Sequence, residues 1–308
     1  MSKFLAIVLS AFAISTAYAK EVVTINYAFS PADSMANYTR TLVDEANRIQ
    51  DKYNFIFDTK PGAGGAIAAQ WGRANPNNGI VMTSSAFFIR PNFYPNESYD
   101  IADFKEILPE CNAPIAVSSV KYKTWKEVPK DSPITIGVSG LGVTTHLVAT
   151  QLQKKYPNLT VVPFKSTTDA LLSMVGNNTD FSVGFLSEPE NWGKDTSKVK
   201  VVILGITGNK VIHGHPTLVS EGFPKVLENL NAPHHLIVSV KVPDAKFADW
   251  RAILVKAAKT KSVQDSYALD SCEPLNTTPD NEIQPWFHMQ NSRWKQLTYG
   301  AKLEYNGK

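Results

Sequence analysis

Short apolar segments alternate with longer segments of helical periodicity along most of the chain. This alternation is typical of α/β folds, in which helices connect the strands of a sheet. The pattern predicts strands at 22–27, 55–59, 80–84, 115–120, 134–139, 160–163, 181–184, 199–205 and 236–240. It predicts helices at 34–50, 67–73, 145–155, 168–176, 247–259 and 283–299. The sequence therefore predicts an α/β protein, and no internal repeat is visible.

The length of the chain and the order of these segments predict two lobes. Chains longer than about 250 residues tend to divide, and this one has 308 residues. We expect residues 20–115 and 238–308 to form the first lobe and residues 116–237 to form the second. Each lobe should be a mostly parallel sheet flanked by helices. A ligand would then lie in the cleft where strand ends and helix starts face each other.

The first 19 residues have the three parts of a secretory signal peptide. Lys3 supplies the positive charge, residues 4–14 are apolar, and Ala17-Tyr18-Ala19 is a small-x-small cleavage site. A buried N-terminal helix is the alternative, but a strand-like segment follows directly. We expect cleavage after Ala19. No later apolar run approaches the roughly 20 residues that span a membrane.

Charge and cysteine content narrow the possible functions. The chain has 31 basic and 28 acidic side chains, a balance that does not supply the basic surface needed for nucleic-acid binding. Its two cysteines, Cys111 and Cys272, could form one disulfide in an oxidising compartment or remain two separate buried thiols. The sequence leaves both possibilities open.

Three turns rich in glycine or hydroxyl residues are the strongest candidates for ligand binding, and they lie at 28–34, 61–67 and 139–146. Each precedes a predicted helix, where free backbone N–H groups and the helix dipole favour an anion. Neither glycine-rich turn is a nucleotide fingerprint, because Ile67 stands where a third glycine is needed and no P-loop lysine follows. The glycines could serve packing alone. Together the turns predict a cleft for a small anion.

Signals for catalysis and metal binding are incomplete. Gly137 to Leu141 resembles a nucleophile elbow, but Leu141 replaces the last glycine of that motif. No full set of nucleophile, base and orienting group accompanies it. The pairs His213/His215 and His234/His235 lack Cys, Asp or Glu at ligand spacing. We therefore expect no catalytic residue, no metal site and no cofactor.

Several motifs, taken in order, resemble the extracytoplasmic substrate-binding proteins of tripartite tricarboxylate transporters, also called the Bug family. The motifs lie at 61–65, 90–94, 99–100 with 103–104, 139–147 (similar to S-x-G-x-G-T-x-x-H-L), 162–165 (similar to V-P-Y-K-G), 204–207, 216–224, and 294 with 300–304. Each motif alone is weak. Their shared order covers nearly the whole chain after residue 19.

This resemblance implies a type II periplasmic binding protein, a venus flytrap of two lobes. Such a protein captures a small organic carboxylate, a di- or tricarboxylate or a related acid, and delivers it to integral membrane transporter subunits. The resemblance also implies secretion to the periplasm, and we expect a monomer. Two alternatives remain: a binding protein that signals to a membrane receptor, and a secreted hydrolase.

The resemblance also assigns candidate ligand contacts. In the first lobe they are Phe29, Ser30, Ser34, Gly64, Gly65, Ser84, Ser85 and Ala86. In the second lobe they are Gly142, Val143, Thr144, Thr145, Lys165 and Ser166, with His146 supporting the loop. Val143 stands where the family usually has Thr or Ser, and Ser166 replaces the glycine after the lysine. These departures leave the identity of the ligand open.

Overall fold

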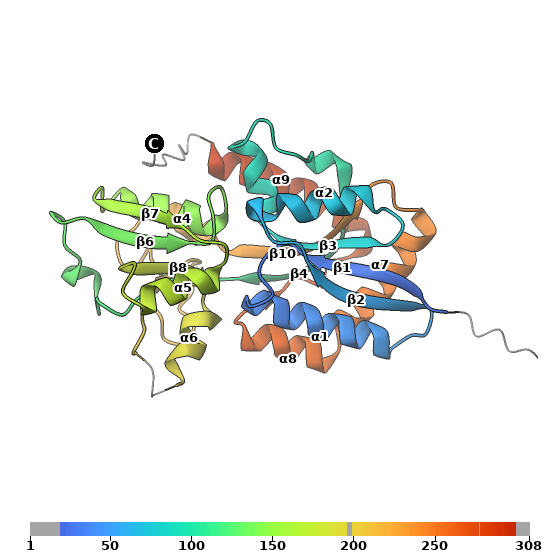
Figure 1. Ribbon diagram of the computed structural model, residues 1–308, viewed down its shortest axis with the longest axis horizontal. Helices are drawn as coiled ribbons and strands as arrows, with labels where there is room; N and C mark the ends of the chain where they lie inside the picture. Colours follow the sequence, from blue (N-terminus) through green and yellow to red (C-terminus); the bar gives the residue numbers. More distant parts are fainter. Residues whose placement is uncertain (1–18, 196–198, 277, 300–308) are drawn as a thin grey trace, which may run out of the picture.

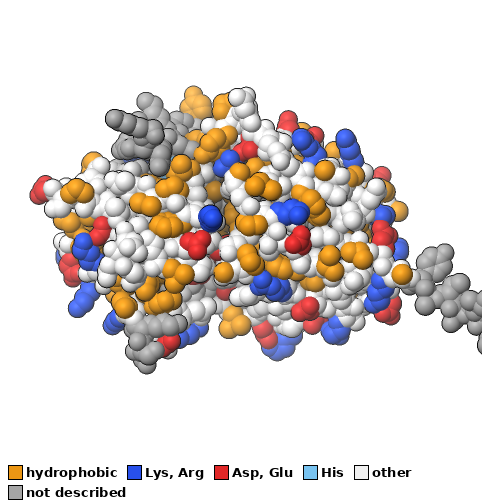
Figure 2. All heavy atoms as spheres, in the orientation of Figure 1, with side chains coloured by type: hydrophobic (Ala, Val, Ile, Leu, Met, Phe, Trp, Pro, Cys, Tyr) orange, Lys and Arg blue, Asp and Glu red, His pale blue; other side chains and the backbone are white. Residues whose placement is uncertain are grey.

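The computed structural model describes residues 19–195, 199–276 and 278–299. The predicted signal segment up to residue 18 and the motif residues 300–304 lie outside these ranges. Within them, no helix is both long enough and apolar enough to cross a membrane. Basic and acidic side chains are interspersed on the face shown in Figure 2, with no continuous basic area among the described residues there.

Two sheets, each flanked by helices, lie side by side and form two lobes (Figure 1). The first lobe has the strand order β11-β4-β10-β3-β1-β2. These strands are β1 (Glu21–Tyr27), β2 (Tyr53–Thr59), β3 (Gly79–Ser84), β4 (Phe104–Ala113), β10 (Ala232–Ser239) and β11 (Glu273–Pro274). The second lobe has the order β7-β6-β8-β5-β9. These strands are β5 (Ile115–Ser119), β6 (Ile134–Val138), β7 (Leu159–Pro163), β8 (Phe181–Phe185) and β9 (Val202–Ile206).

Helices cover both faces of the first sheet (Figure 1), with α1 and α8 on one side and α2 and α9 on the other. In the second lobe, α4 and α5 both pack on β6 and β8. The helices are α1 (Ser34–Arg48), α2 (Ala66–Ala74), α3 (Ala86–Ile89), α4 (Thr144–Gln153), α5 (Thr167–Val175), α6 (Ser187–Gly193), α7 (Asp244–Ala258), α8 (Lys261–Leu269) and α9 (Ile283–Thr298).

The two-lobed α/β architecture is confirmed, but each sheet is mixed rather than mostly parallel. In the first sheet β1 runs parallel to β2 and β3, whereas β10 runs antiparallel to β3 and β4. In the second, β6 runs parallel to β7 and β8, whereas β5 runs antiparallel to β8 and β9. The antiparallel pairs involve the strands at the crossings between lobes. These strands are not joined by the helical crossovers that make neighbouring strands parallel.

The chain crosses from one lobe to the other at Pro114 and returns before β10. Pro114 alone separates β4 from β5, close to the limit expected at residue 115. On the return, β10 begins at Ala232 and pairs only with strands of the first sheet. The limit expected at residue 237 therefore falls inside a first-lobe strand. Pro233, His234 and His235 deprive the start of β10 of an apolar pattern, so the sequence placed this strand too late.

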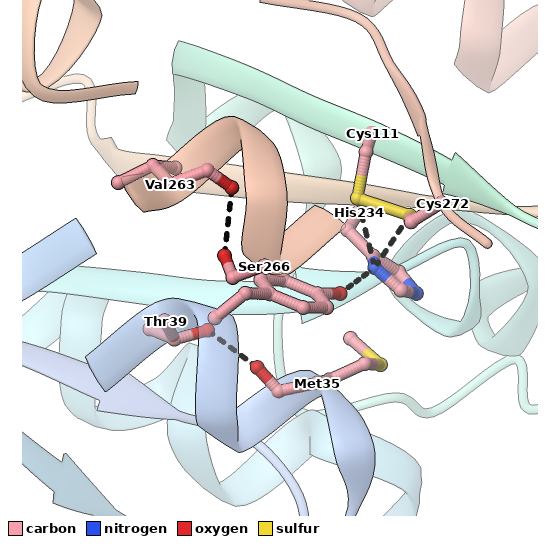
Figure 3. The surroundings of a disulfide bond; sticks show 8 residues. Met35, Thr39, Cys111, His234, Val263, Ser266 and Cys272 are labelled. Atoms are coloured by element: carbon pink, nitrogen blue, oxygen red, sulfur yellow. Dashed lines mark hydrogen bonds between the residues drawn. A yellow bond between two sulfur atoms is a disulfide. The ribbon is translucent and has the colours of Figure 1, made fainter. Parts of the chain in front are cut away.

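The structure joins Cys111 and Cys272 in a disulfide whose Cα atoms are 5.5 Å apart (Figure 3). Cys111 lies on β4, and Cys272 follows α8. His234 of the neighbouring β10 packs beside the bridge, with its Nδ1 atom 3.8 Å from each sulfur. The hydroxyl of Tyr38 on α1 contacts the same nitrogen. The bridge therefore ties the segment after α8 to β4, which lies next to the edge strand β11 of the first sheet. It uses both sulfurs that could otherwise ligate a metal beside His234.

Candidate functional site

A small cavity lies between the lobes, where strand ends and helix starts meet. The first lobe lines it with Tyr27, Phe29, Asp33, Met35, Ser84 and Ala232. The second lobe lines it with Ile115, Ser139, Val143, Thr144, Thr145, Thr167 and Phe185. The mixture of apolar walls with a few polar groups is typical of small-molecule sites.

A more open groove adjoins this cavity, and the two share Phe29 and Ser139. The groove is lined by the turn at 61–64, by Arg90 and Tyr94, and by residues 140–141 and 163–165 of the second lobe. It therefore brings both predicted glycine-rich turns to one place. It also brings two cations, Arg90 and Lys165, near the entrance of the cavity.

The first turn of α4 is the part of the cavity best suited to an anion. The chain enters α4 through Gly140 and Gly142, whose φ angles of +124° and +70° suit glycine far better than other residues. Val143 at the N-cap position provides no side-chain hydrogen bond to the first N–H groups of the helix. Free N–H groups at a helix start, together with the helix dipole, attract negative charge. The hydroxyls of Thr144 and Thr145 lie at the same place.

Hydrogen bonds hold this turn in shape. The N–H of Gly142 donates to Nδ1 of His146 at 3.0 Å, and the N–H of Ser139 donates to the Thr145 hydroxyl at 3.1 Å. Burial lowers the pKa of His146 to about 4, so the ring is neutral and its Nδ1 can accept. His146 therefore contacts the loop that the sequence expected it to support.

The two lobes contact each other across the cleft. The hydroxyls of Ser85 and Thr144 are hydrogen bonded to each other. Nη1 of Arg90 donates to the carbonyl oxygen of Leu141 at 3.3 Å, while its Nε holds Glu97 at 2.7 Å in a largely buried ion pair. These contacts join residues of the first lobe to the turn before α4 and to its first residue. The structure is therefore in a closed arrangement.

Two carboxylates from opposite lobes also approach each other in the cleft. Asp33, at the N-cap of α1, is 3% exposed, and its Oδ2 accepts a hydrogen bond from the Tyr27 hydroxyl at 3.2 Å. Glu188 of α6 accepts one from the Thr167 hydroxyl at 2.7 Å. Burial raises the pKa of Asp33 to about 7. Burial is also the main cause that raises the pKa of Glu188 to about 8, and the negative charge of Asp33 acts in the same direction.

The predicted ligand contacts divide into three groups. Phe29, Ser84, Val143, Thr144 and Thr145 line the cavity. Gly64 and Lys165 line the groove, as Phe29 does too. The remaining predicted residues, Ser30, Ser34, Gly65, Ser85, Ala86, Gly142 and Ser166, are absent from the linings of both spaces. Ser166 has a local role instead, because its hydroxyl accepts the N–H of Asp169 and so caps α5. The roles of all these residues as ligand contacts stay predictions.

Several lining residues were missed by the sequence reasoning. Asp33 and Ser139 lie inside the turns singled out above, so the signal was present but was not assigned to them. Thr167 directly follows the predicted Ser166. Phe185 and Ala232 lie at strand ends that only the assembled lobes bring to the cavity.

Known proteins resemble this chain over most of its length. A family model described as "Tripartite tricarboxylate transporter family receptor" matches residues 25–277. No curated protein matches the chain.

Among solved structures, the periplasmic binding protein BugD is similar at a TM-score of 0.80 and 21% identity, with 93% of this chain and 99% of that one covered. An R. palustris protein, Rpa4515, solved with adipate, has a TM-score of 0.77 and 17% identity, covering 92% and 97%. MatC from Rhodopseudomonas palustris, solved with bound malate, has a TM-score of 0.73 and 17% identity, covering 90% and 98%. At these identities, the likeness establishes a shared two-lobed fold.

Proposed function

Since the chain belongs to the tripartite tricarboxylate transporter receptor family, we propose that it captures a small organic acid between its lobes and delivers it to integral membrane transporter subunits. The family is one of periplasmic solute-binding receptors rather than enzymes. The observation that carries the proposal for this chain is the interlobe cavity that faces the uncapped start of α4.

Two observations support a carboxylate as the ligand. The N–H groups and hydroxyls at the start of α4 provide donors that a carboxylate accepts well. Adipate and malate, named with two of the similar structures, are both dicarboxylates. Lys165 of the adjoining groove is exposed and has no ion pair among the described residues, so it is available to a second acidic group of the ligand.

The proposed mechanism is closure of the two lobes around the acid. A ligand that contacts both lobes binds the closed state more tightly than the open state and shifts the population towards it. The contacts of Ser85 with Thr144 and of Arg90 with Leu141 form only when the lobes meet. The transporter subunits would recognise the surface that closure creates.

The proposal also covers export, the oligomeric state and the limits of the two lobes. We propose export to the periplasm with cleavage after Ala19, and a monomer that needs no cofactor or metal. We place residues 20–115 in the first lobe and the following segment in the second. The C-terminal part of the first lobe begins at Ala232 rather than at residue 238.

A thermal-shift screen of residues 20–308 tests the binding function. The protein is first unfolded, dialysed and refolded so that no bound acid remains. It is then heated with mono-, di- and tricarboxylates, with amino acids and with neutral sugars as controls. An acid present at about 100 times its Kd adds about 2.7 kcal/mol of stability, which gives a clear rise in Tm. Flat melting with every acid would refute the proposal. Binding without uptake in a cell assay would instead indicate a sensor.

A further inference from the structure

The disulfide of the first lobe lies beside a third side chain that can bind a metal. Cys111, Cys272 and His234 are all buried, and Nδ1 of His234 faces both sulfurs at 3.8 Å (Figure 3). One ligand atom from each of the three lies within 4.8 Å of the others, and no other group of three in the described part of the chain meets this condition. The cysteines lie 123 and 38 positions from the histidine in the chain, so sequence spacing gave no sign of the cluster.

The distances in this cluster are close to those of a tetrahedral zinc site. Zn–S bonds of about 2.3 Å and Zn–N bonds of about 2.0 Å, at tetrahedral angles, place the nitrogen about 3.5 Å from each sulfur and the sulfurs about 3.8 Å apart. Nδ1 of His234 is therefore already almost at the required distance from both sulfurs. Only the sulfurs have to move apart, and they can do so once the bond between them is broken.

The histidine already has the protonation state of a metal ligand. Burial lowers the pKa of His234 well below its ordinary value, so its ring is neutral, which is the form that binds metals. The hydroxyl of Tyr38 contacts Nδ1 of His234 and so lies next to the fourth position of a tetrahedral ion. Two thiolates would balance the charge of Zn²⁺, which removes the cost of burying an uncompensated charge.

We propose that reduction of the Cys111–Cys272 disulfide converts this cluster into a buried Zn²⁺ site, with both sulfurs and Nδ1 of His234 as ligands. A dithiol reductant supplies two electrons and two protons, so that the S–S bond breaks, both cysteines become thiols and the reductant becomes a disulfide. Zn²⁺ then displaces the two thiol protons and forms two Zn–S bonds. The disulfide and the metal therefore exclude each other, and the site does not depend on the acid bound between the lobes.

Reduction also gives the ion a way into the buried cluster. The segment after α8 pairs with β4 through only two residues, Glu273 and Pro274 of β11, and both are exposed. Without the disulfide, so short a pairing can open locally and admit the ion. The bound ion would then join β4, β10 and the segment after α8, whereas the disulfide joins only the first and the last of these. A reduced chain would in this way keep the link that reduction breaks.

Cobalt binding to residues 20–308 tests the inference, because Co²⁺ occupies zinc sites and has a visible spectrum. The protein is reduced without oxygen by a phosphine, which offers no competing thiolate, and Co²⁺ is then titrated at neutral pH. The reduced wild type should bind one ion per chain. It should show a thiolate-to-cobalt charge-transfer band in the near ultraviolet and the intense visible bands of tetrahedral cobalt, and Zn²⁺ should abolish both. The oxidised wild type should show neither.

His234→Asn tests the third ligand. The loss of a mere outer-shell partner costs about 10- to 100-fold in metal affinity, so the loss of this ligand should weaken Co²⁺ binding by at least about tenfold. His213→Asn is the matched control, since exposed His213 contacts Glu190 on the second lobe and its φ of +50° suits Asn. It should keep the affinity and the charge-transfer band. A surface ion held by His213 and Glu190 would lack that band.

Two results would overturn the inference. If the reduced wild type binds no Co²⁺, binds it without the charge-transfer band, or is unfolded with Co²⁺ present by far-UV circular dichroism, the cluster is not a metal site. If His234→Asn binds Co²⁺ as tightly as the wild type and with the same spectrum, the histidine is not a ligand. The comparison of reduced with oxidised wild type decides the question even if His234→Asn does not fold. Neither result touches the proposed binding of an organic acid, which the thermal-shift screen tests on the oxidised protein.

Discussion

Glu110 provides a direct test of the electrostatics of the first lobe. It lies on β4 and is completely buried, and the Tyr267 hydroxyl interacts with its carboxyl group. Burial raises the pKa of Glu110 from its ordinary 4.5 to about 8, and the charge of Glu106 acts in the same direction. The unfolded chain returns this carboxyl to water and to its ordinary pKa.

The sign of the effect on stability follows from this difference in pKa. Between about pH 4.5 and pH 8, the Glu110 carboxyl group holds a proton in the folded protein but has released it in the unfolded chain. The free energy of unfolding therefore falls as pH rises, by up to about 1.4 kcal/mol per pH unit. Between about pH 5.5 and pH 8 the loss from Glu110 has an upper limit of about 3 kcal/mol. Glu110→Gln is similar in size and neutral at every pH, so it should lack this loss.

The assay is urea unfolding followed by tryptophan fluorescence at these two pH values. Burial also raises the pKa of Asp33, Glu188 and Asp270, so the wild type should lose stability for several reasons. The comparison of Glu110→Gln with the wild type isolates the contribution of Glu110. Exposed Glu273→Gln is the matched control and should follow the wild type. Equal pH dependence in Glu110→Gln and the wild type would show that Glu110 is not the buried neutral acid described here.

Two further changes test the site and the disulfide. Thr144→Asp places a negative charge at the start of α4 and should weaken acid binding by about 1 to 3 kcal/mol in isothermal titration. Thr150→Asp, outside the cavity on the same helix, should not weaken it. Unchanged affinity in Thr144→Asp would show that this helix start is not part of the site. The double variant Cys111→Ser/Cys272→Ser opens a bridge between residues 161 apart in sequence. Its unfolding free energy should fall by up to about 5 kcal/mol, and the unreduced wild type should contain no free thiol. Two titratable thiols in the unfolded wild type would contradict the bridge.

The sequence predicted those elements whose pattern is local. The strand expected at 22–27 is β1, Glu21–Tyr27, and the helix expected at 145–155 is α4, Thr144–Gln153. Their apolar positions, and the glycine-rich entry of α4, follow from hydrophobic burial and turn chemistry that neighbouring residues determine. The ends of these elements differ by only one or two residues.

The strand β4 was missed because its side chains break the apolar pattern. Glu106 and Glu110 both lie on it and are fully buried, and Pro109 interrupts the run between them. Glu106 is tolerated inside because Oε2 meets Nδ1 of His235 on the neighbouring β10 at 3.1 Å. His235 lies 129 positions away in the chain. Local reasoning has no access to such a partner, so buried charged strands are difficult to predict.

The sequence predicted the parts of the site that depend on local backbone conformation. It missed the parts that form only when the two lobes come together. The glycines and hydroxyl residues of the turn before α4 predict it directly from the sequence. Asp33 lies in an equally conspicuous turn, but its burial requires Thr167 and Thr168 from the other lobe. An acidic residue at the start of a helix is normally interpreted as a solvent-exposed N-cap. Only the closed arrangement of the lobes turns it into a buried acid.

This difference suggests how closure and the burial of two carboxylates are connected. Asp33 and Glu188 come from different lobes, so opening the cleft would separate them and return both to water. Closing an empty cleft therefore costs free energy, either to bury the charges or to bind protons. A ligand that contacts both lobes offsets that cost, and its carboxylate adds contacts at the start of α4. Under the proposed function, the same two carboxylates that make the empty closed state unfavourable would make the loaded closed state recognisable to the transporter, because only the right ligand stabilises it.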